Sequence, residues 1–224
     1  MRSKYTPILT LIILFGACAA FISCGEKEPE VADFTGDKVE YTLREFNGSG
    51  LSGKVTFEER VDNSTRVTVD LNGSFAADLP VQIRNGDEVE GGEILVILNP
   101  VSFSSKTSVT EVSQTLGGSQ ITFQSLLTVN GHIRVNSDPL DLASVGAAVG
   151  LGENELLSDS ESYTISESSG SGVNGTLTFT KRKAGHTLAT LSFTGTQDGL
   201  LHPAGIYQNN SDLGGQEIIQ LNAI

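Results

Sequence analysis

The chain has 224 residues, and its 27 acidic against 14 basic side chains give a net charge of −13 at pH 7. Such an acidic surface repels phosphate groups, so we expect no nucleic-acid partner. With 38% hydrophobic residues, no Trp and 25 Gly, the composition is typical of thin β-structure with many turns rather than of a large dense core.

The first residues have the composition of a secretory leader. Arg2 and Lys4 precede an apolar run from Pro7 to Ser23, which predicts a signal peptide over 1–23. A transmembrane anchor is the alternative. We disfavour it because the run is short and no basic stop-transfer segment follows.

Cys24 follows this leader within the stretch FISCGEKEPE, which resembles a bacterial lipoprotein cleavage box. Two or three acyl chains on Cys24 would anchor the mature protein to a membrane. Cys18 is the rival site and ordinary cleavage near it is a further alternative, but a polar segment follows only Cys24. The charged residues 24–38 predict a flexible tether. We therefore expect a membrane-anchored lipoprotein of the cell envelope, on the periplasmic or surface face of the outer membrane.

An internal repeat follows the tether. The stretch YTLREFNGSGLSGKVTFEER, which begins at Tyr41, matches YTISESSGSGVNGTLTFTKR, which begins 122 residues later at Tyr163. Farther along, LPVQI matches HPAGI at an offset of 123 residues. We predict a first repeat over 39–160 and a partial second repeat over 161–224. Because the second is too small to be secure alone, its strands should pack on the first repeat or meet another chain.

The repeated segments alternate between apolar and polar residues. In TRVTVDLNG, Val67, Val69 and Leu71 share one face, and TLATLSFTG in the second copy has the same period of two. This period predicts strands with one buried face. The more uniformly apolar stretch EILVILNPV, 93–101, predicts a central strand. Short strands separated by turn signals indicate an all-β sandwich or barrel.

The segment between the copies, 102–160, has no second copy. Within it, TSVTEVS and HIRVN predict strands. Leu142, Val145 and Val149 follow helical spacing, and Pro139 before them suits a first helical position. We therefore predict a short helix in the 138–150 region.

These blocks together resemble the CHRD, or chordin-type, domain found in bacterial lipoproteins. That family carries HPAHIH, a polar loop, a Gly-Gly pair, an apolar strand and LNPV. The stretches LLHPAGIYQNNSDLGGQEIIQLNAI and GGEILVILNPV match this pattern, and VNGHIRVNSDPLDLASVGAAVGLGENEL matches a later family block. The resemblance covers about residues 39 to 224. It implies an immunoglobulin-like β-sandwich of one full and one partial repeat, with an interaction or structural role rather than a reaction.

The chain departs from this family at the histidines. The first copy reads LPVQIR and has none of the three family histidines, and the second reads HPAGIY, which keeps His202 and has Tyr207 in place of another. His132 and His186 are the remaining histidines, whereas a stable zinc site needs about three or four protein ligands. We therefore predict no metal and no cofactor. A metal-binding or redox domain with a degenerate His site is the alternative.

The acidic loop NGDEVEGGE, 85–93, offers Asp87 and Glu88 for contact with a ligand. It lacks the spaced oxygen ligands of a known calcium loop, so we predict a solvated loop. No Gly-x-Ser-x-Gly motif is present, and we predict that the protein is not an enzyme, with an enzyme of unknown type as a further alternative. The candidate contacts for a protein or glycan partner are Asp87, Glu88, His202 and Tyr207.

Overall fold

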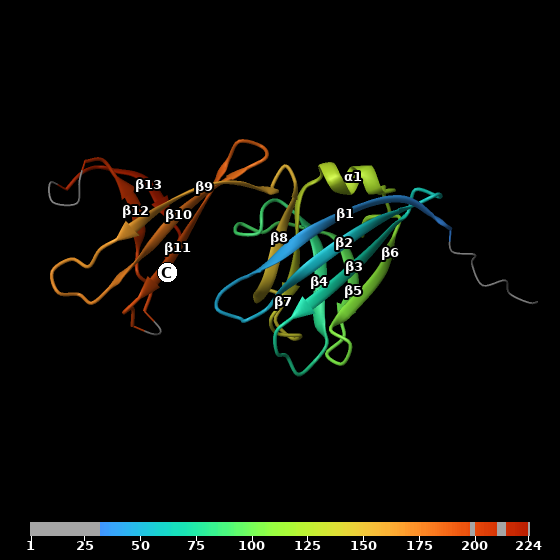
Figure 1. Cartoon of the computed structure of the whole chain (residues 1–224), viewed down its shortest axis with the longest axis horizontal. Helices are drawn as coiled ribbons and strands as arrows, with labels where there is room; N and C mark the ends of the chain where they lie inside the picture. The colour runs from blue at the N-terminus through green and yellow to red at the C-terminus, as the bar shows by residue number, and fades with distance from the viewer. Residues whose placement is uncertain (1–31, 198–199, 210–213, 224) are drawn as a thin grey trace, which may run out of the picture. The chain divides into compact units, whose positions relative to one another are not determined.

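The computed structural model describes residues 32–197, 200–209 and 214–223, so the predicted leader 1–23 and the lipidation site Cys24 lie outside the described residues. The fold is almost entirely β, which confirms the predicted class (Figure 1). In this part of the chain, no helix is both long and apolar enough to cross a membrane. The elements are β1 (Phe34–Glu45), β2 (Ser52–Arg60), β3 (Thr65–Asn72), β4 (Leu79–Asn85), β5 (Ile94–Val101), β6 (Thr107–Val112), α1 (Phe123–Thr128), β7 (Asn130–Asn136), β8 (Val145–Gly152), β9 (Leu156–Ile165), β10 (Asn174–Arg182), β11 (Thr187–Thr194), β12 (Ala204–Tyr207) and β13 (Glu217–Leu221).

The first eight strands form one antiparallel sheet in the order β5-β4-β7-β8-β1-β2-β3-β6. Strand β1 pairs with β2 along most of its length and with β8 at its last two residues, so it joins the two halves of the sheet. The edge strands β5 and β6 come together through Asn99, whose N–H donates to Thr110 Oγ1 at 2.9 Å and whose carbonyl accepts from Ser108 Oγ at 2.6 Å. The sheet therefore folds over into a sandwich around one core (Figure 1).

The core follows from the period-two pattern of the strands. In β3, Val67, Val69 and Leu71 are buried while the intervening residues are half-exposed, which confirms the predicted alternation. Phe57 of β2 is fully buried and meets the Tyr41 ring edge-on at a centroid distance of 5.5 Å. Each large apolar side chain buried in this way contributes about 1.5–3 kcal/mol.

Strands β9–β13 repeat the pairings of β1–β5. Leu177 lies opposite Leu191 in the β10–β11 pair, as Val55 lies opposite Val69 in the β2–β3 pair. The second set divides into a three-stranded sheet, β11-β10-β9, and a two-stranded sheet, β12-β13. Repeated sequence thus gives repeated strand register, although the boundaries 39–160 and 161–224 and the packing of the second repeat on the first stay predictions.

The helix predicted in the 138–150 region is wrong. Asp138 and Asp141 each accept, at 2.8 Å, the backbone N–H of the second residue that follows, and such contacts stabilise turns that compete with a helix. Leu142, part of the expected apolar face, is 49% exposed. The small residues after it form β8, which lies between β7 and β1 and is buried along nearly its whole length.

The helix lies earlier, as α1. Thr122 caps it by accepting the N–H of Ser125 at 3.2 Å, and the Ser125 hydroxyl accepts the N–H of Thr122 at 2.7 Å. Phe123 and Leu126, three residues apart, are buried in the core. This reciprocal cap satisfies two N–H groups that would otherwise lack partners at the start of the helix.

Two strand expectations also differ from the structure. The stretch 93–101 predicts a central strand, but β5 lies at one edge of the eight-stranded sheet and, among the described strands, pairs along its length only with β4. Ile97 of β5 is accordingly 57% exposed. β1 begins at Phe34, inside the predicted tether 24–38. The guanidinium of Arg60 lies 4.2 Å from the Phe34 ring and gives the start of the strand a contact.

Candidate functional site

Glu88, one of the predicted contacts, lies in the β4–β5 loop with a fully buried side chain. Its Oε1 accepts from Arg44 Nη2 at 3.3 Å, and its Oε2 accepts from Arg182 Nη1 at 3.0 Å. Arg182 also donates to the carbonyl of Asn154 at 2.6 Å. The prediction of a solvated loop is therefore wrong for Glu88, because a buried carboxylate is stable only with such partners.

Asp87, the neighbouring predicted contact, shapes the loop. Its Oδ1 accepts the N–H of Val89 at 2.8 Å and that of Glu90 at 2.7 Å, which closes a tight turn. The carboxylates of Asp87 and Glu88 thus have different local partners. They do not converge on one ligand position.

A buried imidazole lies beside this loop. His132 is fully buried on β7, and its Nδ1 lies 2.9 Å from the carbonyl of Gly86, which assigns the proton to Nδ1. Its Nε2 is buried and has no hydrogen-bond partner among the described residues. Burial lowers the pKa of His132, since desolvation disfavours the charged ring. Asn154 Nδ2 donates to the same Gly86 carbonyl at 3.0 Å, so this cluster holds the loop against β7.

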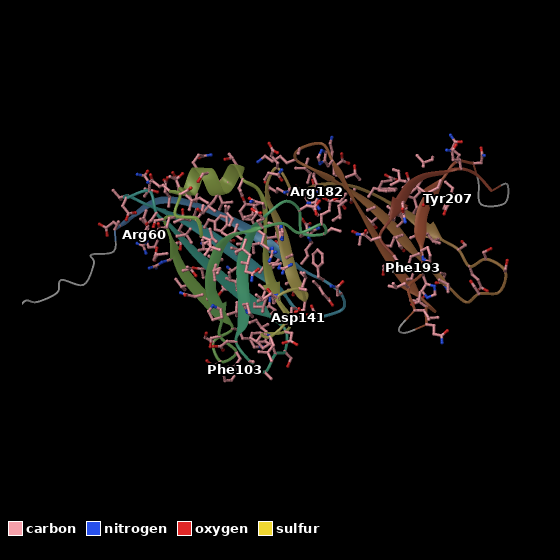
Figure 2. The ribbon with its side chains drawn as sticks, turned by 180° about the vertical axis from the view of Figure 1, so that it is seen from behind. Arg60, Phe103, Asp141, Arg182, Phe193 and Tyr207 are labelled. Carbon is pink, nitrogen blue, oxygen red and sulfur yellow. The ribbon has the colours of Figure 1, made fainter. Side chains whose placement is uncertain are left out.

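The repeat explains why Arg182 needs Glu88. Arg182 occupies the position in the second repeat that Arg60 occupies in the first, and both are labelled in Figure 2. Both side chains are 4% exposed. Arg60 forms two hydrogen bonds with Glu111 of β6, at 2.6 and 2.7 Å. The described part of the second repeat has no counterpart of β6, and Glu88 of the first repeat takes the role of Glu111. Sequence reasoning did not identify Arg44 and Arg182 as partners of Glu88. The match between Arg60 and Arg182 shows that the two arginines are equivalent, but it does not show which carboxylate each one binds.

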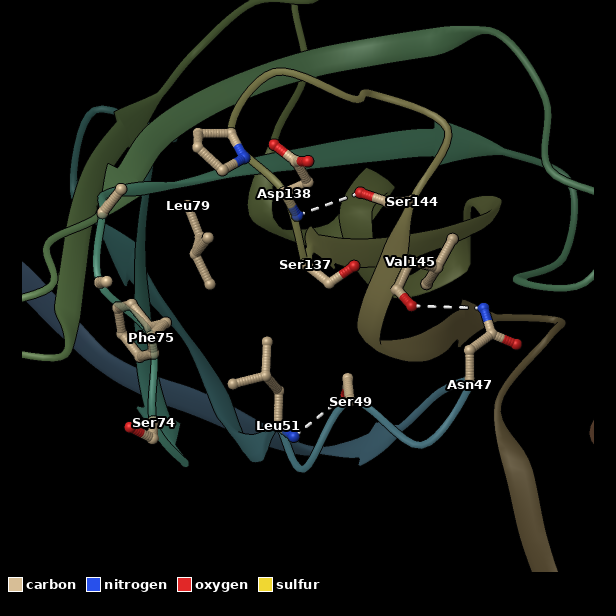
Figure 3. Close-up of a pocket in the computed structure, with 13 residues that line it drawn as sticks. Asn47, Ser49, Leu51, Ser74, Phe75, Leu79, Ser137, Asp138, Ser144 and Val145 are labelled. Carbon is tan, nitrogen blue, oxygen red and sulfur yellow. Dashed lines mark hydrogen bonds between the residues drawn. The ribbon is translucent and has the colours of Figure 1, made fainter. Parts of the chain in front are cut away.

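A cavity of about 610 Å³ lies at one end of the first repeat, between the β1–β2, β3–β4 and β7–β8 loops (Figure 3). Its polar side chains hold these loops together. Ser49 Oγ, from the β1–β2 loop, donates to the carbonyl of Gly146 at the start of β8 at 2.6 Å. Within the β7–β8 loop, Ser144 Oγ donates to the carbonyl of Asp141 at 2.7 Å. Leu51, Phe75 and other apolar residues complete the wall. The volume lies within the range of ligand sites, but these two hydroxyls already donate to backbone carbonyls of the protein.

A second cavity, of about 350 Å³, lies between the two small sheets of the second repeat. His202 and Tyr207 line it from the β12 side, and Leu177, Leu191 and Phe193 line it from β10 and β11. We call this cavity and its lining the repeat 2 groove. The structure therefore brings two predicted contacts, His202 and Tyr207, to one place. Asp87 and Glu88 line neither cavity.

Matching positions differ in exposure between the repeats. Val55, Phe57 and Val69 are fully buried, whereas their counterparts Leu177, Phe179 and Leu191 are only half-buried. The difference is larger for the matched tyrosines, since Tyr41 is 7% exposed and Tyr163 is 53% exposed. In the first repeat the β7–β8 hairpin and α1 complete the core around these positions. The inner face of the second repeat is therefore an apolar surface that is only partly covered.

Within the described residues, no three His, Cys, Asp or Glu side chains gather as they would around a metal ion. No family model, no curated protein and no solved structure matches the chain. The resemblance to the CHRD domain therefore stays a proposal that rests on the sequence blocks.

Proposed function

We propose that the chain is a lipid-anchored protein of the bacterial cell envelope, with CHRD-like repeats that act by binding or structural support rather than by catalysis. The apolar leader and the sequence around Cys24 support the anchor. The partners of Asp87 and Glu88 support a non-catalytic role for the acidic loop, because those carboxylates already hold the turn and two arginines.

One observation carries the binding role. The inner-face positions of the second repeat, among them Leu177 and Leu191, are half-exposed although the same positions are fully buried in the first repeat. A contiguous apolar surface of this kind is typical of a site that another molecule covers. The closed first repeat serves as the scaffold that carries it.

The anchor is tested by labelling cells that express the full chain with radioactive palmitate. We expect label in the wild type and in Cys18→Ala, and loss of the label in Cys24→Ala. Label retained by Cys24→Ala and lost by Cys18→Ala would move the anchor to the other cysteine. Absence of label from all three would contradict the lipoprotein proposal.

The binding role is tested in intact cells with a photo-crosslinking residue. It replaces Leu191, on the inner face of β11, or the adjacent exposed Thr190 as the matched control. We expect a discrete adduct from position 191 and none from position 190. Adducts of equal yield at both positions, or none at either, would contradict binding through this face.

A further inference from the structure

We propose that the repeat 2 groove binds a β-hairpin supplied by a second polypeptide chain, with the same small and apolar character as the β7–β8 hairpin of the first repeat. This inference rests on the binding role proposed above and names the partner chemistry. It predicts recognition through backbone hydrogen bonds along a strand edge, with apolar side chains inserted into the groove.

The first repeat shows what occupies the equivalent space. There β7 pairs with β4 over five residues, and β8 pairs with the end of β1 at Arg44 and Glu45. The β7–β8 hairpin thus bridges the two halves of the sandwich. Ile133 and Val149, which lie opposite each other in this hairpin, belong to the same core as Val55 and Val69.

The second repeat, as far as the structure describes it, presents the same edges without a hairpin that corresponds to β7–β8. Among the described residues β12 pairs only with β13, and β9 pairs only with β10. β9 ends at Ile165, so the residues that correspond to Arg44 and Glu45 lie beyond its end. Unpaired strand edges of this kind accept an added strand. In the first repeat, β7 and β8 join β4–β5 to β1–β3 in one sheet. In the second repeat, the corresponding sheets β12-β13 and β11-β10-β9 therefore remain separate.

The chemistry of the occupant follows from β8. A Cβ on Gly146 would lie 2.7 Å from Leu51 Cδ1 and 3.1 Å from Ser137 Cβ, so a larger residue fits at this position only if these neighbours shift. Leu51 corresponds to Val173, which lines the repeat 2 groove. An occupant should therefore carry a small residue beside Val173 and apolar residues beside Leu177 and Leu191.

A second copy of this chain is the less suitable donor, because its own β7–β8 hairpin is buried within its first repeat. Donation of that hairpin would open the core that contains Ile133 and Leu151. A hairpin from another protein carries no such cost. We therefore assign the donor to a different chain.

The probe is a synthetic peptide with the sequence of residues 130–152, labelled with a fluorophore and titrated with the purified full chain. We expect saturable binding by fluorescence anisotropy. Leu177→Asp should weaken binding at least about tenfold, since a charge would then enter an apolar groove. Thr176→Asp is the matched control, because it places the same charge on the exposed face of the same strand. A peptide with Ile133→Asp and Val149→Asp should not bind.

The failures are distinguishable. If a folded wild-type chain does not bind the peptide but still gives the crosslink at position 191, the hairpin proposal is wrong and the proposed binding role stands. Equal weakening by Leu177→Asp and Thr176→Asp also overturns it. Self-association on sedimentation, abolished by Leu177→Asp and without peptide binding, would assign the groove to a second copy instead. Loss of both the crosslink and peptide binding contradicts the proposed function as well.

Discussion

Glu88 links segments that are far apart in the sequence. Its carboxylate is shared by Arg44 of β1 and Arg182 at the end of β10, and both Glu88 and Arg182 are almost fully buried. The buried Arg182 and the partly exposed Arg44 would repel each other without it. Partial burial also lowers the pKa of Arg44, since desolvation disfavours the charged form. Glu88 therefore has a structural role.

We predict that Glu88→Gln lowers the free energy of unfolding by about 3–5 kcal/mol, because it leaves Arg182 buried without a counter-charge. Chemical denaturation followed by circular dichroism measures the loss. Glu90→Gln, in the same loop but exposed, is the control and should change stability by less than about 0.5 kcal/mol. A Glu88→Gln variant as stable as the control would show that the pair contributes nothing.

His132 predicts a dependence of stability on pH. Its pKa in the folded chain is lowered by burial from an ordinary value of 6.5. Below that value the unfolded chain binds a proton that the folded chain resists, so stability falls as the pH drops from about 7 towards the lowered pKa. Glu111, whose pKa is lowered by its hydrogen bond with Arg60, changes the stability of the fold only near and below pH 4.5. The two effects therefore occupy different pH ranges.

We therefore expect the wild type to lose stability between about pH 7 and pH 5, and His132→Gln to show a shallower slope over this range. Thermal denaturation at stepped pH values measures both slopes. His186→Gln, which removes an exposed imidazole from the β10–β11 turn, is the control. Identical slopes in the wild type and in His132→Gln would contradict this account.

Strand β8 shows how burial can outweigh the spacing of apolar residues. The spacing of its valines fits a helix, but three glycines within eight residues weaken a helix by about 1 kcal/mol each. β8 is buried along nearly its whole length, and neighbouring atoms approach its glycines too closely for larger side chains. A Cβ on Gly150 would lie 2.1 Å from the carbonyl oxygen of Asn154, in the turn that carries the Arg182 contact.

Gly150→Ala should therefore lower the free energy of unfolding by about 1–3 kcal/mol, because the added methyl group forces the adjacent turn to move. A shift in the thermal midpoint measures it. Gly117→Ala is the matched control, since its Cβ would have no atom nearer than 3.8 Å. If both variants have the same thermal midpoint, the turn accommodates the methyl group and the Asn154 carbonyl does not restrict the residue at position 150.

The internal repeat was the most informative feature of the sequence for the fold. Alternation predicted β3 and its counterpart β11, and the shared offset predicted their common register. The order of strands in the sheet was not predictable, because it depends on which edges meet after folding. The same limit applies to Glu88, whose charge indicated solvent exposure although its partners come from β1 and β10.

The β2–β3 and β10–β11 pairs have the same register but unequal burial, so we expect their amides to exchange hydrogen at different rates. The β2–β3 and β10–β11 pairs have matching ladders, so differences in their protection report how firmly each repeat holds its strands. Because Val55 and Phe57 are fully buried while Leu177 and Phe179 are half-exposed, amides in β10–β11 should exchange at least about tenfold faster. Mass spectrometry of fragments covering 52–72 and 174–194 measures this ratio.

The same measurement with the 130–152 peptide connects burial to binding. A hairpin that fills the repeat 2 groove removes Leu177 and Leu191 from water and pairs the free edge of β12, so exchange in β10–β12 should slow while β2–β3 stays unchanged. Equal protection of the two repeats without peptide would mean that the second repeat is as stable as the first without a bound partner. In that case its half-exposed inner face would need no partner and no covering hairpin.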